Sequence, residues 1–203
     1  MLGDSGVGKT SILNRFVQDK FDNNCPSTLG ASFIPKVLIK GDKQYKFQIW
    51  DTAGQEKYKT LAPLYYRGFY QYLIKQNQNI QFLLDSHAAL IVYDITNKQS
   101  FQVLQNWVNE LNQNGPPNIV IAVVGNKVDL IEKEEVKYED AKAYARNLKA
   151  LFQYTSAKEN KNVVDLFEQI AEKIDENQDQ VQKEKGQSLR KDKGIEKAKG
   201  GCC

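Results

Sequence analysis

One stretch near the amino end constrains this chain more than any other. Residues 3–10 read Gly-Asp-Ser-Gly-Val-Gly-Lys-Thr, which matches the pattern G-x-x-x-x-G-K-S/T without deviation. In this pattern the glycines let the loop curl so that its backbone N–H groups point at a polyphosphate. The helix predicted from about Thr10 to Gln18 would direct the positive end of its dipole at the same phosphates. A Gly-rich turn before a helix can also match by chance, so the pattern needs support from the rest of the chain.

The residues of this loop have separate predicted roles. Lys9 would reach the β- and γ-phosphates, and the hydroxyl of Thr10 would hold Mg²⁺. The remaining phosphate contacts are predicted at Ser5, Gly6, Val7 and Gly8. A strand should come directly before such a loop, but only Met1 and Leu2 precede Gly3. The first strand of the predicted sheet is therefore expected to be truncated.

Composition limits the class of protein. The chain has 203 residues, of which 41% are hydrophobic and 26% are charged, as in one soluble globular domain with an appendage. No apolar run approaches the roughly 20 residues of a membrane span, and no signal peptide is recognisable, so synthesis in the cytosol is expected. A net charge of +3 is too small to indicate nucleic acid as a partner. Cys25 stands alone and Cys202 and Cys203 are adjacent, which does not indicate a disulfide framework.

Strand and helix patterns alternate along the chain. Residues 88–94 and 119–125 are nearly continuous apolar runs, typical of parallel strands buried on both faces. A hairpin is predicted from residues 32–40 and 45–50, because Gly41 and Asp42 form a turn between them. Further elements are predicted as helices at 100–111, 138–148 and 163–174 and a short strand at 152–155. This order predicts a doubly wound α/β fold, with a mostly parallel sheet and helices on both faces.

Polar residues follow the predicted strands at the edge where ligands bind in such sheets. Asp51 begins the segment Asp51-Thr52-Ala53-Gly54 directly after the hairpin. By itself Asp51 could be a turn residue or a helix cap. Behind the phosphate loop it is better explained as a second anchor for Mg²⁺.

Two further segments indicate which base is bound. Asn126-Lys127-Val128-Asp129 follows the strand at 119–125, and Thr155-Ser156-Ala157-Lys158 ends the next one. The Asp129 carboxylate can accept two hydrogen bonds from N1 and N2 of guanine, a donor pair that adenine lacks. Asn126 can bond the acceptor edge of the base, the stem of Lys127 can lie along it, and a backbone N–H of the second segment can meet O6. The predicted base contacts of that segment are Ser156, Ala157 and Lys158.

These segments together resemble the Rab branch of the Ras-like small GTPases, whose fold is the P-loop NTPase fold. The resemblance covers residues 1 to about 174 and includes all five guanine-nucleotide motifs in order. The motifs beyond those quoted above are Thr28-Leu29-Gly30, Trp50-Asp-Thr-Ala-Gly-Gln-Glu, Tyr65-Tyr66-Arg67-Gly68 and Val92-Tyr93-Asp94-Ile95-Thr96. Residues 62–68 and 117–122 are most similar to the early-endosomal Rabs.

The resemblance implies roles for single residues. Thr28 matches the switch I threonine that senses Mg²⁺ and the γ-phosphate, and Phe21 matches the aromatic residue that packs on guanine. Gly54 matches the glycine whose N–H meets the γ-phosphate, and Gln55 matches the catalytic residue that orients the attacking water. Thr10, Thr28 and Asp51 would hold Mg²⁺, Asp51 through a water. An arginine from an activating protein normally stabilises the transition state in such sites, contributing about 10³–10⁵ in rate.

The carboxyl end is predicted to be a separate segment. Residues 1–174 would form the GTPase domain, and residues 175–203 a disordered tail without an apolar stripe. From Lys183 to Cys203 there are seven lysines and arginines and three acidic residues, a net charge of 7 − 3 = +4. The ending Gly-Gly-Cys202-Cys203 resembles a double geranylgeranylation site, and two lipids anchor a protein stably whereas one does not.

The family resemblance also implies partners and a location. The expected partners are GTP or GDP, an exchange factor, a GTPase-activating protein, a GDP-dissociation inhibitor, effectors and a membrane. The expected location is the cytoplasmic face of endomembranes, most specifically the early endosome, with cycling through the cytosol. The expected function is a GTP-hydrolysing switch in vesicle traffic.

Two departures from the family pattern leave alternatives open. The first strand is short, and residues 69–86 separate Gly68 from the next strand, where the family has almost no spacer. That segment is either a genuine helical extension or a retained intron translated in frame, and the second interpretation is favoured. His87, next to it, is predicted to have no catalytic role. A GTP-binding-only protein, or one that cannot fold, is therefore the alternative to a working switch.

Overall fold

The computed structural model describes residues 1–54, 86–116 and 118–196. Four parallel strands form its central sheet in the order β1-β4-β5-β6, and β2 and β3 form an antiparallel hairpin. The strands are β1 (Leu2–Gly3), β2 (Ala31–Lys40), β3 (Lys43–Thr52), β4 (Ala88–Asp94), β5 (Val120–Asn126) and β6 (Leu151–Thr155). The helices are α1 (Lys9–Gln18), α4 (Lys98–Asn114), the 3-10 helix η3 (Val128–Lys133), α5 (Tyr138–Asn147) and α6 (Val163–Glu196).

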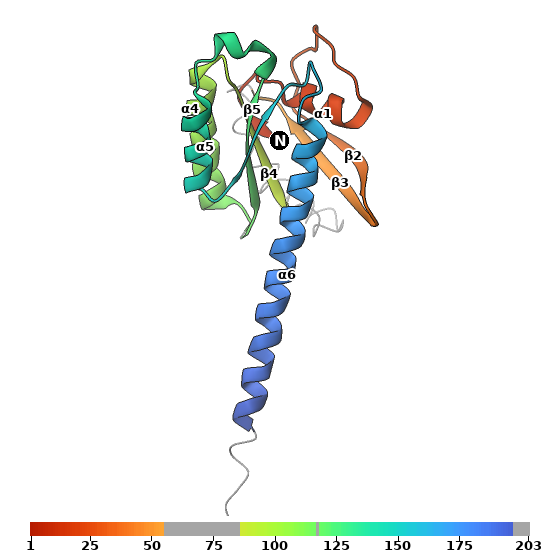
Figure 1. Cartoon of the computed structure of the whole chain (residues 1–203), viewed down its shortest axis with the longest axis vertical. Coiled ribbons are helices and arrows are strands. Elements are labelled where there is room, and N and C mark those ends of the chain that lie inside the picture. Colours follow the sequence, from red (N-terminus) through yellow and green to blue (C-terminus); the bar gives the residue numbers. More distant parts are fainter. Residues whose placement is uncertain (55–85, 117, 197–203) are drawn as a thin grey trace, which may run out of the picture.

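Helices cover both faces of the parallel sheet, as predicted (Figure 1). Successive side chains of a strand point to opposite faces, so the apolar run of β4 supplies two cores. Leu90 and Val92 pack in one core with residues of α1 and α6, including Phe16 and Phe167. The other core contains Ile91 with residues of α4 and α5. The doubly wound α/β prediction is confirmed.

The first strand is short, and this changes the sheet. β1 has two residues, which pair with Ile91 and Val92 of β4. Among the described residues, its link to β3 consists of two bonds: the Met1 amine donates to the Trp50 carbonyl at 2.6 Å, and the Thr52 hydroxyl donates to the Met1 carbonyl at 2.7 Å. The hairpin is therefore a separate two-stranded sheet, whereas the sequence predicts one continuous sheet.

The last helix differs from the prediction. The sequence predicts that the helix ends near Ile174 and that a disordered tail follows from residue 175. Instead α6 continues to Glu196 and extends beyond the rest of the fold (Figure 1). The segment is rich in Glu, Gln and Lys, which are good helix formers, and the ion pair between Lys173 and Glu176 at 2.8 Å is of the type that supports an exposed helix. An apolar stripe is therefore not needed for this segment to be helical.

Several predictions concern residues that are not described. Gln55, Cys202 and Cys203 lie outside the described residues, and so does the segment 69–86 apart from Ser86. Among the helices that are described, none is both long enough and apolar enough to cross a membrane.

Candidate nucleotide-binding site

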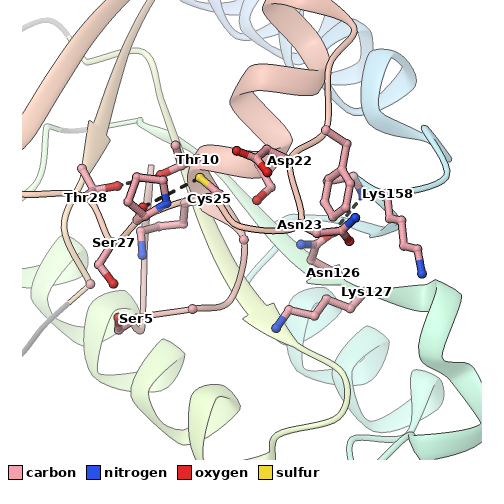
Figure 2. Close-up of a pocket in the computed structure, with 18 of the residues that line it drawn as sticks. Ser5, Thr10, Asp22, Asn23, Cys25, Ser27, Thr28, Asn126, Lys127 and Lys158 are labelled. Atoms are coloured by element: carbon pink, nitrogen blue, oxygen red, sulfur yellow. Dashed lines mark hydrogen bonds between the residues drawn. The ribbon is translucent and has the colours of Figure 1, made fainter.

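The carboxyl ends of the strands and the loops after them surround a pocket of about 390 Å³. Figure 2 shows Ser5 and Thr10 near one end of it and Asn126, Lys127 and Lys158 near the other. Of the predicted site residues, the pocket is lined by Ser5, Gly6, Gly8, Lys9, Thr10, Phe21, Thr28, Gly54, Asn126, Lys127, Asp129, Ala157 and Lys158. Val7, Asp51 and Ser156 are buried, and each forms a hydrogen bond with a residue of this lining. The predicted site residues that the structure describes therefore lie in this pocket or next to it.

The phosphate loop has the backbone that its glycines predict. Gly8 has a φ of 95°, in the left-handed region, and a Cβ there would lie 2.3 Å from the side-chain nitrogen of Asn126. Only glycine fits this position without displacing Asn126. Gly8 is the N-cap of α1, whose first turn contains no acidic residue, so the end of the helix is electrostatically suited to an anion.

Lys9 lies under the loop and is almost fully buried. Its ammonium group donates to the carbonyls of Gly3 at 3.0 Å and Asp4 at 2.7 Å. Burial lowers the pKa of Lys9 to about 8, although the charges of Asp51 and Asp4 act in the opposite direction. A buried cation held by two neutral carbonyls is a strong site for a phosphate group, which would supply the missing negative charge.

Three oxygen-bearing side chains meet where Mg²⁺ is predicted. The hydroxyl of Thr10 lies 2.5 Å from Oδ2 of Asp51 and 2.7 Å from the hydroxyl of Thr28, which is 3.4 Å from the same carboxylate oxygen. The other carboxylate oxygen of Asp51 is buried and has no hydrogen-bond partner among the described residues. Hydroxyl and carboxylate oxygens are the ligands that Mg²⁺ prefers, and an unsatisfied buried oxygen is well suited to a cation or its water. The donor set therefore fits Mg²⁺.

Gly54, which follows β3 in the chain, packs closely against the phosphate loop. A Cβ at this position would lie 2.3 Å from the carbonyl of Asp4 and 2.4 Å from the nitrogen of Ser5, so only glycine permits this approach. The close packing is consistent with the role predicted for its N–H. The next residue, Gln55, is the predicted catalytic residue, and its role remains a prediction.

The predicted guanine end of the pocket is held together by side-chain hydrogen bonds. The hydroxyl of Ser156 donates to Oδ1 of Asp129 at 2.6 Å. Asn126 donates to the carbonyl of Val7 at 2.9 Å and accepts from the hydroxyl of Thr155 at 3.1 Å. Asn126 thus joins the phosphate loop to the end of β6, a positioning role beyond the predicted base contact.

Two further residues position this end of the pocket, and the sequence predicted no role for either of them. Asp94 forms an ion pair with Lys127 at 2.6 Å, which fixes the stem that is predicted to lie along the base. Arg15 of α1 donates to the carbonyls of Ala157 at 2.9 Å and Lys158 at 3.2 Å. The position of Asp94 at the end of a buried strand could have predicted that it lies at the pocket. Arg15 gave no comparable signal, because its partners are more than 140 positions away.

Because the charge of Lys9 is buried, we expect the free energy of unfolding of the nucleotide-free protein to depend on pH. Below about pH 8 Lys9 is protonated in both the folded and the unfolded states, and burying its charge lowers the free energy of unfolding. Between about pH 8 and 10.5 the unfolded chain keeps the proton that the folded protein releases, so the free energy of unfolding rises with pH. The slope from this group approaches about 1.4 kcal/mol per pH unit.

Chemical denaturation of the nucleotide-free protein and of Lys9→Met at pH 7.5 and 9.5 measures this effect. From pH 7.5 to pH 9.5 the free energy of unfolding of the unmodified protein should rise by about 1–2 kcal/mol relative to that of the variant, which cannot titrate at this position. If the free energies of unfolding of the two proteins differ by the same amount at both pH values, the pKa of Lys9 is not lowered.

Comparisons with known proteins show the family of this chain. A model of the Ras family matches residues 1–176. The chain is 50% identical over 174 residues to the Ras-related protein Rab-22A of Homo sapiens, an alignment that covers 86% of this chain and 81% of the relative. It is 49% identical over 174 residues to Rab-31 of Rattus norvegicus, covering 86% and 80%. Together with the pocket, these matches show that the chain belongs to the Rab branch of the Ras family of small GTPases, which hydrolyse GTP.

Proposed function

We propose that this protein is a membrane-anchored switch in vesicle traffic that alternates between GTP- and GDP-bound states. The main observation behind the proposal is that the side chains of Thr28, Thr10 and Asp51 lie within hydrogen-bonding distance of one another at the pocket. Thr28 belongs to the loop between α1 and β2, whereas Thr10 is in α1 and Asp51 in β3. The occupancy of the phosphate end can therefore control the position of this loop.

The switch follows from what Thr28 can bind. With GTP present, its hydroxyl would contact Mg²⁺ and its backbone the γ-phosphate, which holds the loop in one arrangement. Loss of the γ-phosphate removes these contacts and releases the loop. Mg²⁺ would supply charge neutralisation between the β- and γ-phosphates. The chain itself supplies Lys9 for the same phosphates and Thr10 and Asp51 for the ion.

An exposed apolar surface next to this loop supports binding of effectors. Leu29 directly follows Thr28 and is 77% exposed. Phe33 and Trp50 are 44% and 39% exposed, and their rings lie 5.2 Å apart across β2 and β3. Exposed apolar groups gathered in this way are typical of protein-binding surfaces. Movement of Thr28 would change this surface, so effectors could distinguish the two nucleotide states. An exchange factor, an activating protein and a GDP-dissociation inhibitor are the further partners that the family implies.

Gln55→Leu tests the hydrolytic half of the proposal. The change removes the group that orients the attacking water but none of the groups that bind phosphate or Mg²⁺. We expect the single-turnover rate of GTP hydrolysis to fall by about 10²-fold, whereas GTP affinity changes little. Gln48→Leu is the matched control, because Gln48 is exposed on β3 and lies outside the pocket. An unchanged rate, with and without an activating protein, would remove Gln55 from the mechanism.

The same experiment distinguishes a working switch from a protein that only binds GTP. An unmodified protein that binds GTP tightly and shows no measurable hydrolysis, with or without an activating protein, would be a binding-only module. The presence of Gln55, Thr28 and Asp129 favours the switch over this alternative. Hydrolysis that is stimulated by an activating protein would favour the switch.

Double prenylation is the proposed means of attachment to endosomal membranes. Changing either Cys202 or Cys203 to serine leaves one lipid site, and a single chain binds a membrane only weakly and reversibly. We expect each single variant to become partly cytosolic and the double variant to become fully cytosolic, measured by fractionation of cells that express tagged protein. Cys25→Ser is the control and should stay on membranes. Membrane attachment of the double variant would contradict the proposal.

A further inference from the structure

One guanidinium group, that of Arg15 on α1, joins this helix to the loop at the base end of the nucleotide pocket. Its Nε donates to the carbonyl of Ala157 at 2.9 Å, and its Nη2 donates to the carbonyl of Lys158 at 3.2 Å. Its Nη1 donates to the backbone carbonyl of Asp19 at 2.8 Å and to Oδ1 of the same residue at 2.9 Å. Asn160 of the loop donates to that carboxylate oxygen at 3.0 Å. The Arg15 side chain is only 14% exposed, so water competes little for its bonds.

The bond to Ala157 acts on a peptide group that can meet the base. The carbonyl of Ala157 and the N–H of Lys158 belong to the same peptide group, and a cation at the carbonyl makes that N–H a stronger donor. Lys158 lines the pocket (Figure 2), and its N–H has no hydrogen-bond partner within the described part of the chain. The N–H of Ala157, in contrast, donates to Oδ1 of Asn126 at 3.4 Å. The N–H of Lys158 is therefore available to O6 of guanine.

The bond to Lys158 leads to the other edge of the base. The carbonyl of Lys158 shares its peptide group with the N–H of Glu159, which donates to the hydroxyl of Ser156 at 3.0 Å. That hydroxyl donates in turn to Oδ1 of Asp129 at 2.6 Å, and Asp129 is the predicted acceptor for N1 and N2 of guanine. Bonds in such a chain support one another. Arg15 thus helps to fix the orientation of the Asp129 carboxylate.

From this connectivity we propose that Arg15 is a positioning residue that strengthens the recognition of guanine at both of its edges. The inference rests on the nucleotide pocket of the proposed function, and it adds a residue that does not line that pocket. Arginine suits this role better than lysine, because the nitrogens of one planar group reach three separate carbonyls at once. The same helix begins at the phosphate loop, so α1 links the two ends of the nucleotide.

Two nucleotide analogues test the two edges separately. The first is 6-thio-GDP, which has sulfur, a weaker acceptor, in place of O6, and the second is inosine diphosphate, which lacks the N2 amine. Displacement of a fluorescent GDP analogue in the presence of Mg²⁺ gives their affinities and that of GDP. In Arg15→Met the affinity for GDP should fall by about 10- to 100-fold. The preference for GDP over each analogue should shrink by about threefold or more, because the variant has already weakened the contact that the analogue removes.

The ratios of these affinities distinguish a positioning role from a general loss of stability. If all three affinities fall by the same factor, Arg15 only stabilises the fold and the proposal is overturned. Arg15→Lys keeps the charge but not the planar group, so we expect intermediate ratios, and these decide the question if Arg15→Met does not fold. Arg146→Met, at an exposed position of α5 outside the pocket, is the control and should change no affinity. Failure of the unmodified chain to bind GDP would overturn the proposed function together with this inference, whereas GDP binding with unchanged ratios would overturn this inference alone.

Discussion

Replacing Asp129 with asparagine is expected to move the preference of the pocket from guanine to xanthine nucleotides. The carboxylate can accept hydrogen bonds from both N1 and N2 of guanine, whereas the amide of asparagine presents one acceptor and one donor group. The donor then meets N2 of guanine, which is also a donor, and both groups lose their partner. In xanthine, an oxygen replaces N2 and can accept from the new amide.

The expected change in affinity is large because the interaction is selective. A site built to bond a particular polar group rejects a ligand that lacks it by about 10⁴–10⁵-fold. GTP binding should therefore weaken by up to this factor, and binding of xanthosine triphosphate should strengthen. Ser156 can still donate to the remaining side-chain oxygen, as it does to Oδ1 of Asp129, so the loop should keep its arrangement.

Competition of each nucleotide against a fluorescent GDP analogue measures both affinities. Asp140→Asn is the matched control, since Asp140 is an exposed carboxylate on α5, and it should bind GTP as the unmodified protein does. Circular dichroism confirms that each variant is folded. GTP affinity that is the same in Asp129→Asn and in the unmodified protein would show that Asp129 does not contact the base.

Lys9→Met is expected to produce the second large effect, a loss of nucleotide affinity at the phosphate end. The ammonium group now bonds two carbonyls of its own loop, and a phosphate would provide it with an opposite charge in a buried setting. Two charge-assisted hydrogen bonds of about 1.5–3 kcal/mol each correspond to a loss of about 10²–10⁴-fold in GTP affinity. Methionine has a similar length and no charge, so it fills the same space.

Titration calorimetry with GDP and with GTP in the presence of Mg²⁺ gives the two affinities. Lys20→Met, at an exposed position after α1, is the control and should leave both unchanged. The nucleotide-free Lys9→Met protein should be at least as stable as the unmodified protein below pH 8, because a buried charge has been removed. A tight complex of Lys9→Met with GTP would contradict the predicted role.

Much of the fold and of the site was predictable from the sequence because it depends on local patterns. The apolar run of residues 88–94 predicted a strand buried on both faces, and β4 indeed contributes to both cores. The spacing of glycines around Lys9 predicted the phosphate loop, since only those residues allow its backbone. The position of Asn126-Lys127-Val128-Asp129 after a predicted strand placed Asp129 at the pocket, because parallel strands end at one edge.

The tertiary structure decided how these residues are held, and the sequence contained no local signal for it. The bond from Ser156 to Asp129, the ion pair of Asp94 with Lys127 and the contacts of Arg15 all join segments far apart in the chain. The extension of α6 could not be inferred from an apolar stripe, because an exposed helix is supported by its own charged pairs. β1 pairs with β4 through two residues, and β2 and β3 form a separate two-stranded sheet. Such features depend on which distant segments become neighbours, and that is set by the packing of the whole chain.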